Sequence, residues 1–367
     1  MSPSGDLSAS GDANALLLRM AQSPAAWLSG DGPFAGIVLS SRVRLARNLG
    51  TIPFGNRATN EERGRVIDEA RAAATRAASL SSGVYIDVSE LSEVDRTLLF
   101  ERHLISRDLA GEQGARGVLV EPSERVSVLV NEEDHLRVQG IAPGYQLAAA
   151  WETADRLDNE LAQSLEFAFS EQWGYLTACP TNVGTGMRAS VLIHLPSLVL
   201  TKQIGKVLQG IAQVGLAIRG LHGEGTEVMG NFFQVSNQTT LGVSESETIE
   251  SLSRVTHQLI DREQEAARVL LRDARVEVED KVFRAHGILA SCRMITSEEM
   301  MSLASAVRFG VELGVLGSVP IANLNQMLIL AQPAHLEKAG GLGEAVSVRD
   351  ERRADLVRGL LRGVDPV

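Results

Sequence analysis

Hydrophobic positions follow a mixed rhythm in the first two thirds of the chain. Short apolar or alternating runs predict strands, and the predicted strands are 37–47, 125–140 (interrupted by an acidic stretch) and 189–196. Stretches with helical spacing lie between them, and the predicted helices are 60–78, 154–169 and 197–215. Residues 232–244 predict a hairpin around a polar turn.

The pattern becomes almost purely helical after about Glu245. Apolar residues recur at helical spacing through 247–273, and a capping box at 296–299 precedes a helix that Gly314 closes. Residues 321–336 predict one further apolar helix. The chain therefore divides into a mixed α and β part and a helical C-terminal part.

Composition narrows the partners that this chain can have. It is 44% hydrophobic and 22% charged, with a net charge of −11, which disfavours non-specific binding to nucleic acid or to an anionic membrane. Two cysteines without a CxxC pair predict neither a disulfide framework nor a zinc site, and they favour a reducing cytoplasm. The sequence shows neither the pattern of a secretory signal nor an apolar run that approaches a membrane span. The first residues are rich in Ser, Gly and Asp, which predicts a disordered tail.

Five arginines stand beside glycine turns or acidic stretches. They are Arg42, Arg44, Arg137, Arg188 and Arg219. Each one alone is best explained as a solvated surface charge. Arg42 and Arg44 are two apart on a predicted strand and therefore project from one face. Guanidinium forks match phosphate oxygens two at a time, so the five together suggest a site for a polyanion such as a nucleoside triphosphate. The common phosphate-loop and protein-kinase motifs do not occur in the sequence.

Acidic residues follow Val128, Leu129 and Val130 of the predicted strand at 125–140. Glu132, Glu133 and Asp134 form a run that is most often a solvated turn, but after a strand they would lie at the mouth of a sheet. Glu224 lies in another loop. Two carboxylates satisfy a substrate guanidinium well, because its planar fork prefers two-pronged acceptors.

Cys179 precedes Pro180 and a glycine turn, close to Arg188. A free cysteine is usually a small buried hydrophobic residue, and Cys292 fits that interpretation. Nearby arginines stabilise a thiolate, which makes Cys179 a candidate reactive group. We expect the glycines of the turn, Gly184 and Gly186, to let the backbone pass close to a nucleotide.

Four stretches in this order resemble the signatures of the phosphagen kinase superfamily, whose members phosphorylate guanidino nitrogens. They are SSRVRLARN, VNEEDHLRV, CPTNVGTGMRASVLIHLP and RGLHGEGTEVMGNFFQVSNQTTLG. The first motif begins at residue 40, without the helical N-terminal domain of the animal enzymes, and LNQMLILAQPAHL and RDERRA occur near the end. In these features the chain resembles the bacterial protein arginine kinases, over about residues 34–357.

This resemblance implies an α+β fold. A phosphagen-kinase-like catalytic domain at 31–245, with an antiparallel sheet flanked by helices, would follow a disordered tail at 1–30. A helical domain at 246–367 would come after it.

The resemblance also implies a role for each matching residue. Glu133 and Glu224 are expected to hold and activate the substrate guanidinium, with Cys179 as the reactive thiol at its edge. The residues expected to contact ATP are Ser40, Ser41, Arg42, Val43, Arg44, His103, Arg137, Arg188, Ala189, Ser190, Val191, Leu192, Arg219, Gly220, Leu221, His222, Gly223 and Glu224. The residues expected to form an allosteric phosphoarginine pocket are Arg349, Asp350, Glu351, Arg352, Arg353 and Ala354. Mg2+ is expected to be held mainly through ATP, with no separate metal site on the protein.

The implied activity is transfer of the ATP γ-phosphoryl group to arginine side chains of proteins. By resemblance, the expected partners are substrate proteins with accessible arginines, the Clp ATPase and protease system, a stress-gene repressor and an activator protein. A homodimer or higher oligomer in the cytoplasm is expected, without direct binding to nucleic acid or membrane.

Three alternatives remain open at this point. A kinase for free arginine would share every catalytic residue, although the domain that closes over small substrates is missing. A cysteine-dependent guanidine hydrolase or amidinotransferase could use Cys179 and two glutamates, but it would leave the five arginines without a purpose. A non-catalytic adaptor could bind phosphoarginine through RDERRA.

Overall fold

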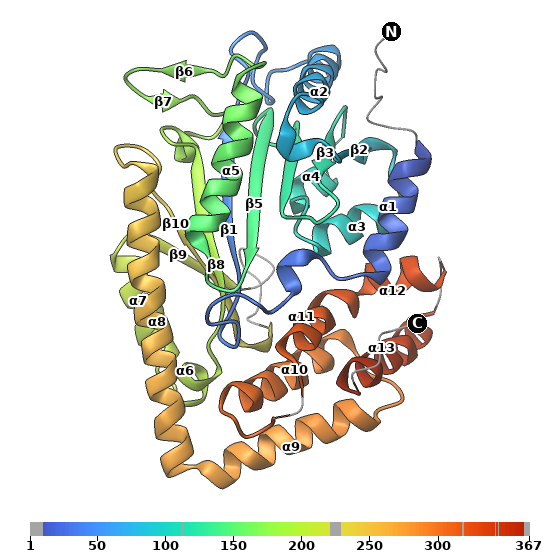
Figure 1. Cartoon of the computed structure of the whole chain (residues 1–367), viewed down its shortest axis with the longest axis vertical. Coiled ribbons are helices and arrows are strands. Elements are labelled where there is room, and N and C mark those ends of the chain that lie inside the picture. The colour runs from blue at the N-terminus through green and yellow to red at the C-terminus, as the bar shows by residue number, and fades with distance from the viewer. Residues whose placement is uncertain are drawn as a thin grey trace.

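The computed structural model describes residues 10–111, 113–220, 229–317, 319–341, 343 and 345–362. Within them, eight strands form one antiparallel sheet in the order β2-β3-β4-β5-β1-β8-β10-β9, which lies at the centre of the molecule (Figure 1). The strands are β1 (Val38–Arg47), β2 (Val84–Asp87), β3 (Gly117–Val120), β4 (Val126–Val130), β5 (Leu136–Pro143), β8 (Met187–His194), β9 (Leu216–Gly220) and β10 (Phe232–Asn237). A separate hairpin consists of β6 (Phe169–Ser170) and β7 (Gly174–Tyr175). The expected antiparallel sheet flanked by helices is confirmed.

Alternation along β1 divides the sheet into two faces with different chemistry. Val43 and Leu45 are fully buried, whereas Arg42 and Arg44, which alternate with them, are half-buried and point the other way. Helix α5 covers the apolar face, and it approaches closely because Gly140 has no side chain: a Cβ there would lie 2.5 Å from the Ala150 carbonyl oxygen. One face of β1 thus builds the core, and the other is left for polar side chains.

Helices enclose this sheet on both faces. The helices before the C-terminal region are α1 (Ser10–Gln22), α2 (Asn60–Ala74), α3 (Glu93–Glu101), α4 (Arg107–Gly111), α5 (Leu147–Ala162), α6 (Pro196–Leu200) and α7 (Ile204–Gln213). They are followed by α8 (Glu245–Asp273), α9 (Arg275–Ser291), α10 (Ser297–Glu312), α11 (Ile321–Leu330), α12 (Pro333–Gly340) and α13 (Val346–Leu361). Short 3-10 turns are η1 (Ala26–Leu28), η2 (Ala78–Leu80), η3 (Val88–Glu90), η4 (Pro180–Asn182) and η5 (Met229–Asn231). In the described part of the chain, no helix combines the length and the apolar character needed to cross a membrane.

The long helix α8 belongs to the core of the sheet. Its residues Leu252, Leu259 and Ile260 are buried in the same cluster as the apolar face of the sheet. The helices from α9 onward form a second core together with Trp27 and Leu28 (Figure 1). The change of core therefore comes at Ala274, where α8 meets α9, and not at residue 245.

The prediction of a disordered tail at 1–30 is wrong for residues 10–30. Helix α1 buries Leu16, Leu17 and Met20 against α3 and β2, and Trp27 is 1% exposed. The polar composition of the first dozen residues concealed the apolar run at 15–20. Residues 1–9 lie outside the described residues.

The helix predicted at 154–169 begins and ends seven residues earlier, as α5. Three other predicted elements are divided or replaced. The helix at 197–215 is divided into α6 and α7, because Lys202 adopts a positive φ of 57° between them. The helix at 321–336 is divided into α11 and α12 just before Pro333, which cannot continue a helix. The hairpin at 232–244 is a single strand, β10, followed by an extended segment whose Thr240 carbonyl accepts from the Thr185 amide at 3.0 Å.

Candidate active site

The sheet brings all five candidate arginines onto its polar face. Arg42 and Arg44 project from β1, and Arg188 on β8 is the direct cross-strand partner of Arg44. Arg137 lies on the same face of β5, on the other side of β1. Arg219 on β9 shares this face two strands beyond Arg188. The five arginines were expected to cluster from loops. In the structure they lie on strands, and the register of the sheet brings them together.

These arginines repel one another inside the protein. Burial, together with the charges of Arg137 and Arg188, lowers the pKa of Arg42 to about 10. Burial and the same neighbours also hold the pKa of Arg44 well below its usual range, although Glu132 partly compensates. The Nε of Arg44 has no hydrogen-bond partner within the described residues. Such a cluster is suited to a polyanion, whose oxygens would supply both the missing acceptors and the missing charge.

A small pocket lies at the β10 side of this row. Its lining residues are Ser40, Arg42, His103, Ile141, Ser190, Leu192 and Gln234. Arg42 donates from Nη2 to Gln234 Oε1 at 3.1 Å, which fixes its guanidinium at the edge of the pocket. Apolar walls, an imidazole ring and hydroxyl groups line this pocket, whose cavity volume is only about 10 Å³.

Four residues expected to contact ATP point away from this face. Val43, Ala189 and Val191 are fully buried in the apolar core. The Ser41 hydroxyl donates to the Gly144 carbonyl at 2.9 Å and accepts from the Gln146 amide at 2.9 Å. Their side chains support the strands and the start of α5, so they do not line the site. Strand alternation explains this difference, because a continuous motif on a strand alternates between two faces.

Glu133 lies at the end of the arginine row and is the exposed member of the acidic run. Its side chain is 45% exposed, and its Oε2 lies 3.6 Å from Arg137 Nη2 and 3.5 Å from Asn182 Nδ2. Glu132, in contrast, is buried and forms an ion pair with Arg137. The structure therefore distinguishes the two glutamates: Glu132 holds Arg137, and Glu133 faces solvent.

Hydrogen bonds hold the two residues that follow Glu133 in the chain. The Asp134 Oδ1 atom accepts from Asn48 Nδ2 at 2.7 Å and from the Ala178 amide at 2.6 Å. The His135 Nδ1 atom accepts from the Leu49 amide at 3.0 Å, so its Nε2–H donates to the Pro53 carbonyl at 2.9 Å. Burial lowers the pKa of His135, which favours this neutral form. The backbone on either side of Glu133 is held in place, and only its carboxylate is left to act.

The Cys179 turn lies next to Glu133. The Cys179 thiol is half-buried and lies 3.0 Å from the Thr181 hydroxyl, and Asn182 of the same turn reaches Glu133. The structure thus brings together Cys179, Glu133 and the end of the arginine row.

The two glycines of this turn are needed for contacts within the protein. Gly184 has a φ of 110°, and a Cβ there would lie 2.2 Å from the Thr240 carbonyl oxygen. Gly186 has a φ of 64°, and a Cβ there would lie 2.6 Å from the Ala46 carbonyl oxygen. Within the protein, these glycines let the turn approach β1 and the segment after β10; their approach to a nucleotide stays a prediction.

Arg47 is a supporting residue that sequence reasoning missed. It is 2% exposed, donates to Asp158 Oδ2 at 3.1 Å from Nε and 2.8 Å from Nη2, and donates to the Thr185 carbonyl at 3.0 Å. Its guanidinium also lies 3.4 Å from the centre of the Tyr175 ring. It joins α5, the Cys179 turn and the β6–β7 hairpin. In the sequence, Arg47 stands in LARN at the end of a predicted strand. That position favours an exposed charge and gives no indication of a buried role.

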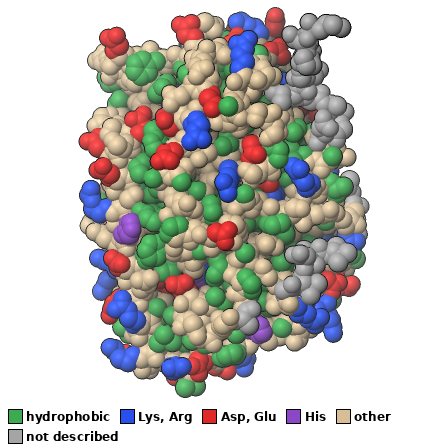
Figure 2. Space-filling view, viewed as in Figure 1, with side chains coloured by type: hydrophobic (Ala, Val, Ile, Leu, Met, Phe, Trp, Pro, Cys, Tyr) green, Lys and Arg blue, Asp and Glu red, His purple; other side chains and the backbone are tan. Residues whose placement is uncertain are grey.

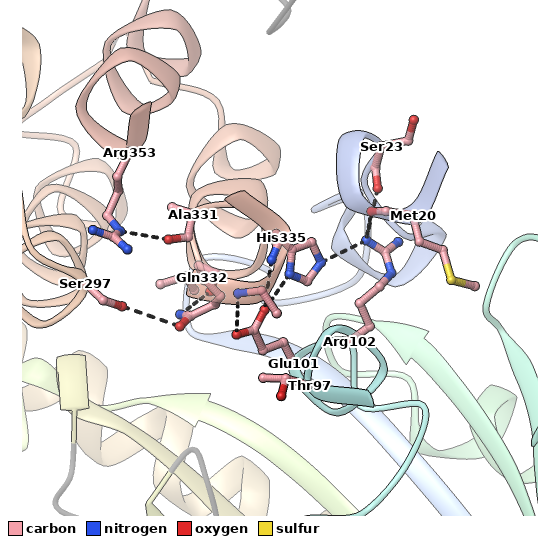
Figure 3. Close-up of polar contacts among 12 residues, drawn as sticks. Met20, Ser23, Thr97, Glu101, Arg102, Ser297, Ala331, Gln332, His335 and Arg353 are labelled. Carbon is pink, nitrogen blue, oxygen red and sulfur yellow. Dashed lines mark hydrogen bonds and ion pairs between the residues drawn. The ribbon is translucent and has the colours of Figure 1, made fainter. Parts of the chain in front are cut away.

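Glu101 and Arg102, which directly precede His103, belong to a buried network between α3 and α12 (Figure 3). Glu101 accepts from the Ala334 amide at 3.1 Å and from His335 Nδ1 at 2.7 Å, so it caps the start of α12. Arg102 is 1% exposed, pairs with Glu124 and donates to His335 Nε2 at 3.3 Å. His103 follows directly with a positive φ of 60°, and its ring lines the pocket beside Arg42. No sequence pattern indicated this connection.

The RDERRA motif lies on α13, on the other side of α12. Arg353 is buried and donates to the Ala331 carbonyl at 2.8 Å, to the Ile295 carbonyl at 2.9 Å and to Asp350 (Figure 3). Arg349 donates to Glu337 of α12 at 3.0 Å. Ala354 is fully buried, whereas Glu351 is exposed and Arg352 packs over Gly340. The six residues are therefore not equivalent: Arg353 and Ala354 hold the helix in place, and Arg349, Asp350 and Arg352 are partly open to solvent.

Part of the expected site lies outside the described residues. Leu221, His222, Gly223 and Glu224 belong to this part, so the expected carboxylate pair is represented by Glu133 alone. Gly220 ends β9 and is buried. In the described ranges, His, Cys, Asp and Glu side chains form no group of three that could hold a metal ion.

Two family models match the chain. The ATP:guanido phosphotransferase C-terminal catalytic domain matches residues 65–266, and the protein-arginine kinase McsB C-terminal domain matches residues 275–366. Among curated proteins, the protein-arginine kinase of Halothermothrix orenii is 46% identical over 332 residues, which are 90% of this chain and 95% of that protein. The protein-arginine kinase of Bacillus subtilis is 43% identical over 334 residues, 90% of this chain and 92% of that protein.

Solved structures of phosphagen kinases share the fold. A duplicated taurocyamine kinase from Schistosoma mansoni, with bound components of a transition-state analogue, matches with a TM-score of 0.58 at 27% identity over 67% of this chain and 35% of that chain. A lombricine kinase matches with a TM-score of 0.56 at 27% identity over 66% of this chain and 72% of that chain.

Proposed function

This chain belongs to the ATP:guanido phosphotransferase family, in its protein-arginine kinase branch, and we propose that it transfers the γ-phosphoryl group of ATP to arginine side chains of proteins. The observation that carries the proposal is the arginine row that ends at Glu133 beside Cys179. A row of mutually repelling guanidinium groups fits a triphosphate, and an exposed carboxylate at its end fits an incoming guanidinium. Relatives of nearly the same length carry the name protein-arginine kinase.

The reaction needs a nucleophile from a group that is normally a cation. An arginine side chain is protonated at neutral pH, and its nitrogen lone pairs are delocalised into the cation. Glu133, together with Glu224 outside the described residues, would accept hydrogen bonds from the guanidinium, align one terminal nitrogen and take its proton. A bond then forms between that nitrogen and the γ-phosphorus while the bond from phosphorus to the β,γ-bridging oxygen breaks, and ADP leaves with the electron pair.

The arginine row would supply most of the positioning in this step. Phosphoryl transfer depends mainly on alignment and on neutralising the phosphate oxygens. Arg42, Arg44 and Arg188 are held in place by strand register, and Arg42 also by Gln234, so they need little reorganisation. Mg2+ bound through the phosphates would supply additional neutralisation. Cys179 would act at the edge of the guanidinium, beside Glu133.

The biological consequences follow from the change of charge. Phosphorylation replaces a cation by an anion, which would remove phosphate contacts from a DNA-binding stress-gene repressor and could mark other proteins for the Clp ATPase and protease system. The proposal includes a cytoplasmic location, an activator protein and a homodimer or higher oligomer. In it, phosphoarginine binds at Arg349 and Asp350 of RDERRA and favours the active assembly.

The function is tested by incubation with Mg-ATP and either free L-arginine or an unfolded arginine-rich protein. Products are analysed by mass spectrometry without acid, because acid hydrolyses the P–N bond. Phosphoarginine on the protein alone, lost in Glu133→Gln and in Glu224→Ala, supports the proposal. Phosphorylation of free arginine alone would make the chain a small-guanidine kinase. The absence of product, with and without candidate activators, would favour the adaptor.

A further inference from the structure

The β6–β7 hairpin exposes large apolar side chains beside the candidate active site. Phe169 is 58% exposed and Trp173 is 48% exposed, and the hairpin projects from the end of the sheet (Figure 1). Leu241, 44% exposed, follows the segment that packs on Gly184. We refer to these three residues as the apolar rim.

The hairpin is rigidly connected to Glu133. At its base the Ala168 amide donates to the Asn48 carbonyl at 2.7 Å, and Asn48 Nδ2 donates to the Leu176 carbonyl at 3.1 Å. The same Asn48 Nδ2 donates to Asp134 at 2.7 Å, and Asp134 directly follows Glu133 in the chain. A single asparagine thus links the base of the hairpin to the residue beside the candidate catalytic carboxylate.

The hairpin is also joined to the Cys179 turn. Tyr175 and Gly184 exchange two backbone hydrogen bonds, of 2.8 and 3.2 Å. The Tyr175 ring stacks against Arg47 on the sheet and lies 5.2 Å, centre to centre, from the Phe169 ring. A two-stranded hairpin alone is only marginally stable in water, and these contacts hold its exposed aromatic side chains in place.

The charge around the rim favours a cationic partner. Glu166 and Glu171 lie on either side of Phe169 in the sequence and are exposed, as is Glu133. Hydrophobic and acidic side chains lie close together in the upper left part of the surface, where Figure 1 shows the hairpin (Figure 2). An apolar surface with exposed carboxylates near it, linked through Asn48 to the residue beside Glu133, matches a flexible peptide that carries arginine next to apolar residues.

We propose that the apolar rim binds the apolar residues that flank the target arginine in an unfolded substrate segment, and so selects such segments over other arginines. This inference rests on the proposed kinase function and identifies its substrate class. Flanking apolar residues are buried in folded proteins, so their contact with Phe169 and Trp173 would report that a substrate has unfolded. Free arginine has no flanking residues, so contacts with the rim would not strengthen its binding.

The test uses two peptides of equal length and charge, with one arginine flanked by Leu and Phe or by Ser and Gly. Initial rates of phosphoarginine formation are measured for the wild-type chain, for F169S/W173S and for F283S. Phe283 is 51% exposed on α9, in the helical part, and serves as the matched control. We expect the wild-type chain to favour the apolar peptide about tenfold in kcat/KM. F169S/W173S should lose about tenfold on the apolar peptide and change the polar one by less than about twofold, and F283S should behave as wild type.

Each other outcome has a distinct meaning. Equal wild-type rates on both peptides, or equal losses on both in F169S/W173S, would overturn the inference while leaving the kinase function intact. A change in sedimentation of F169S/W173S, with the peptide preference retained, would make the rim a contact between copies of the chain and also overturn the inference. No phosphoarginine on any peptide with the wild-type chain would overturn the kinase function itself.

Discussion

Removing Arg102 should destabilise the protein and weaken the proposed nucleotide site together. Arg102 and Glu124 are 1% and 3% exposed, and they are joined by two hydrogen bonds, one of them 2.8 Å from Nε to Oε2. The Arg102 Nη1 atom also donates to the carbonyls of Met20 and Ser23 and to His335 Nε2. This one guanidinium therefore joins α1, α3 and α12.

The magnitude follows from the burial of its partner. In R102M the carboxylate of Glu124 stays buried without a cation, and breaking a buried pair in this way costs about 3–5 kcal/mol. A typical domain is stable by only about 5–15 kcal/mol, so R102M should lose a large part of the free energy of unfolding. E124Q should cost less, because the amide oxygen still accepts from Arg102 and the backbone carbonyls remain as acceptors.

The assay is urea denaturation of the wild type, R102M, E124Q and R102M/E124Q, with ATP affinity measured by calorimetry at a temperature where all remain folded. We expect the double variant to regain about 2 kcal/mol relative to R102M, because it buries no unpaired charge. ATP should bind more weakly to R102M, since His103 follows Arg102 directly and lines the pocket. A cost below about 1 kcal/mol in R102M, or no recovery in the double variant, would refute the reasoning.

Four further changes test other parts of the site. Arg188→Ala should lower the phosphotransfer rate at least about 100-fold. The melting temperature should stay unchanged or rise, because the substitution relieves repulsion on Arg44, and thermal melts with and without ATP measure it. Glu133→Gln should reduce the rate by about 100-fold or more. Its exposed position should keep the free energy of unfolding in urea within about 0.5 kcal/mol of wild type. Gly184→Ala should cost about 2 kcal/mol or more, since its φ of 110° and the nearby carbonyl oxygen reject a Cβ; circular dichroism in urea would detect it. Burial lowers the pKa of His335 below its usual value, so between that lowered pKa and about 6.5 the unfolded chain binds more protons. Stability should therefore fall as the pH drops below about 6.5, and His335→Gln should reduce the slope.

Local patterns allowed much of the sheet and of the helical half to be predicted. The alternation of Val43 and Leu45 with Arg42 and Arg44 was visible in the sequence, and it placed the two arginines on one face. The capping box at Thr296 likewise marked the start of α10. Both features act over a few residues, and a single sequence shows such features directly.

What could not be predicted depends on contacts between distant segments. Arg47 looks like a loop charge until Asp158, 111 residues away, accepts its hydrogen bonds. Glu101 looks like the end of a surface helix until α12 places two amides on its carboxylate, more than 230 residues later. In the same way, Gly184 and Gly186 were assigned to a ligand because the segments that crowd them, at 240 and 46, are remote in sequence.

The two faces of β1 show why the contacts that could not be predicted concentrate around the site. Its inward residues are stabilised by burial against α5, and they pack in one cluster of apolar side chains. Its outward arginines gain nothing from one another, and their pKa values are lowered by burial first and by one another's charge second, which records the cost of this placement. Such a cost persists only because the surrounding sheet, α3 and the Cys179 turn determine where these side chains lie. The buried pairs Arg47–Asp158 and Arg102–Glu124 support residues near this row, and their partners lie 111 and 22 residues apart in the sequence. The groups that would react were therefore recognisable from the sequence, whereas the groups that hold them in position emerge only from the fold.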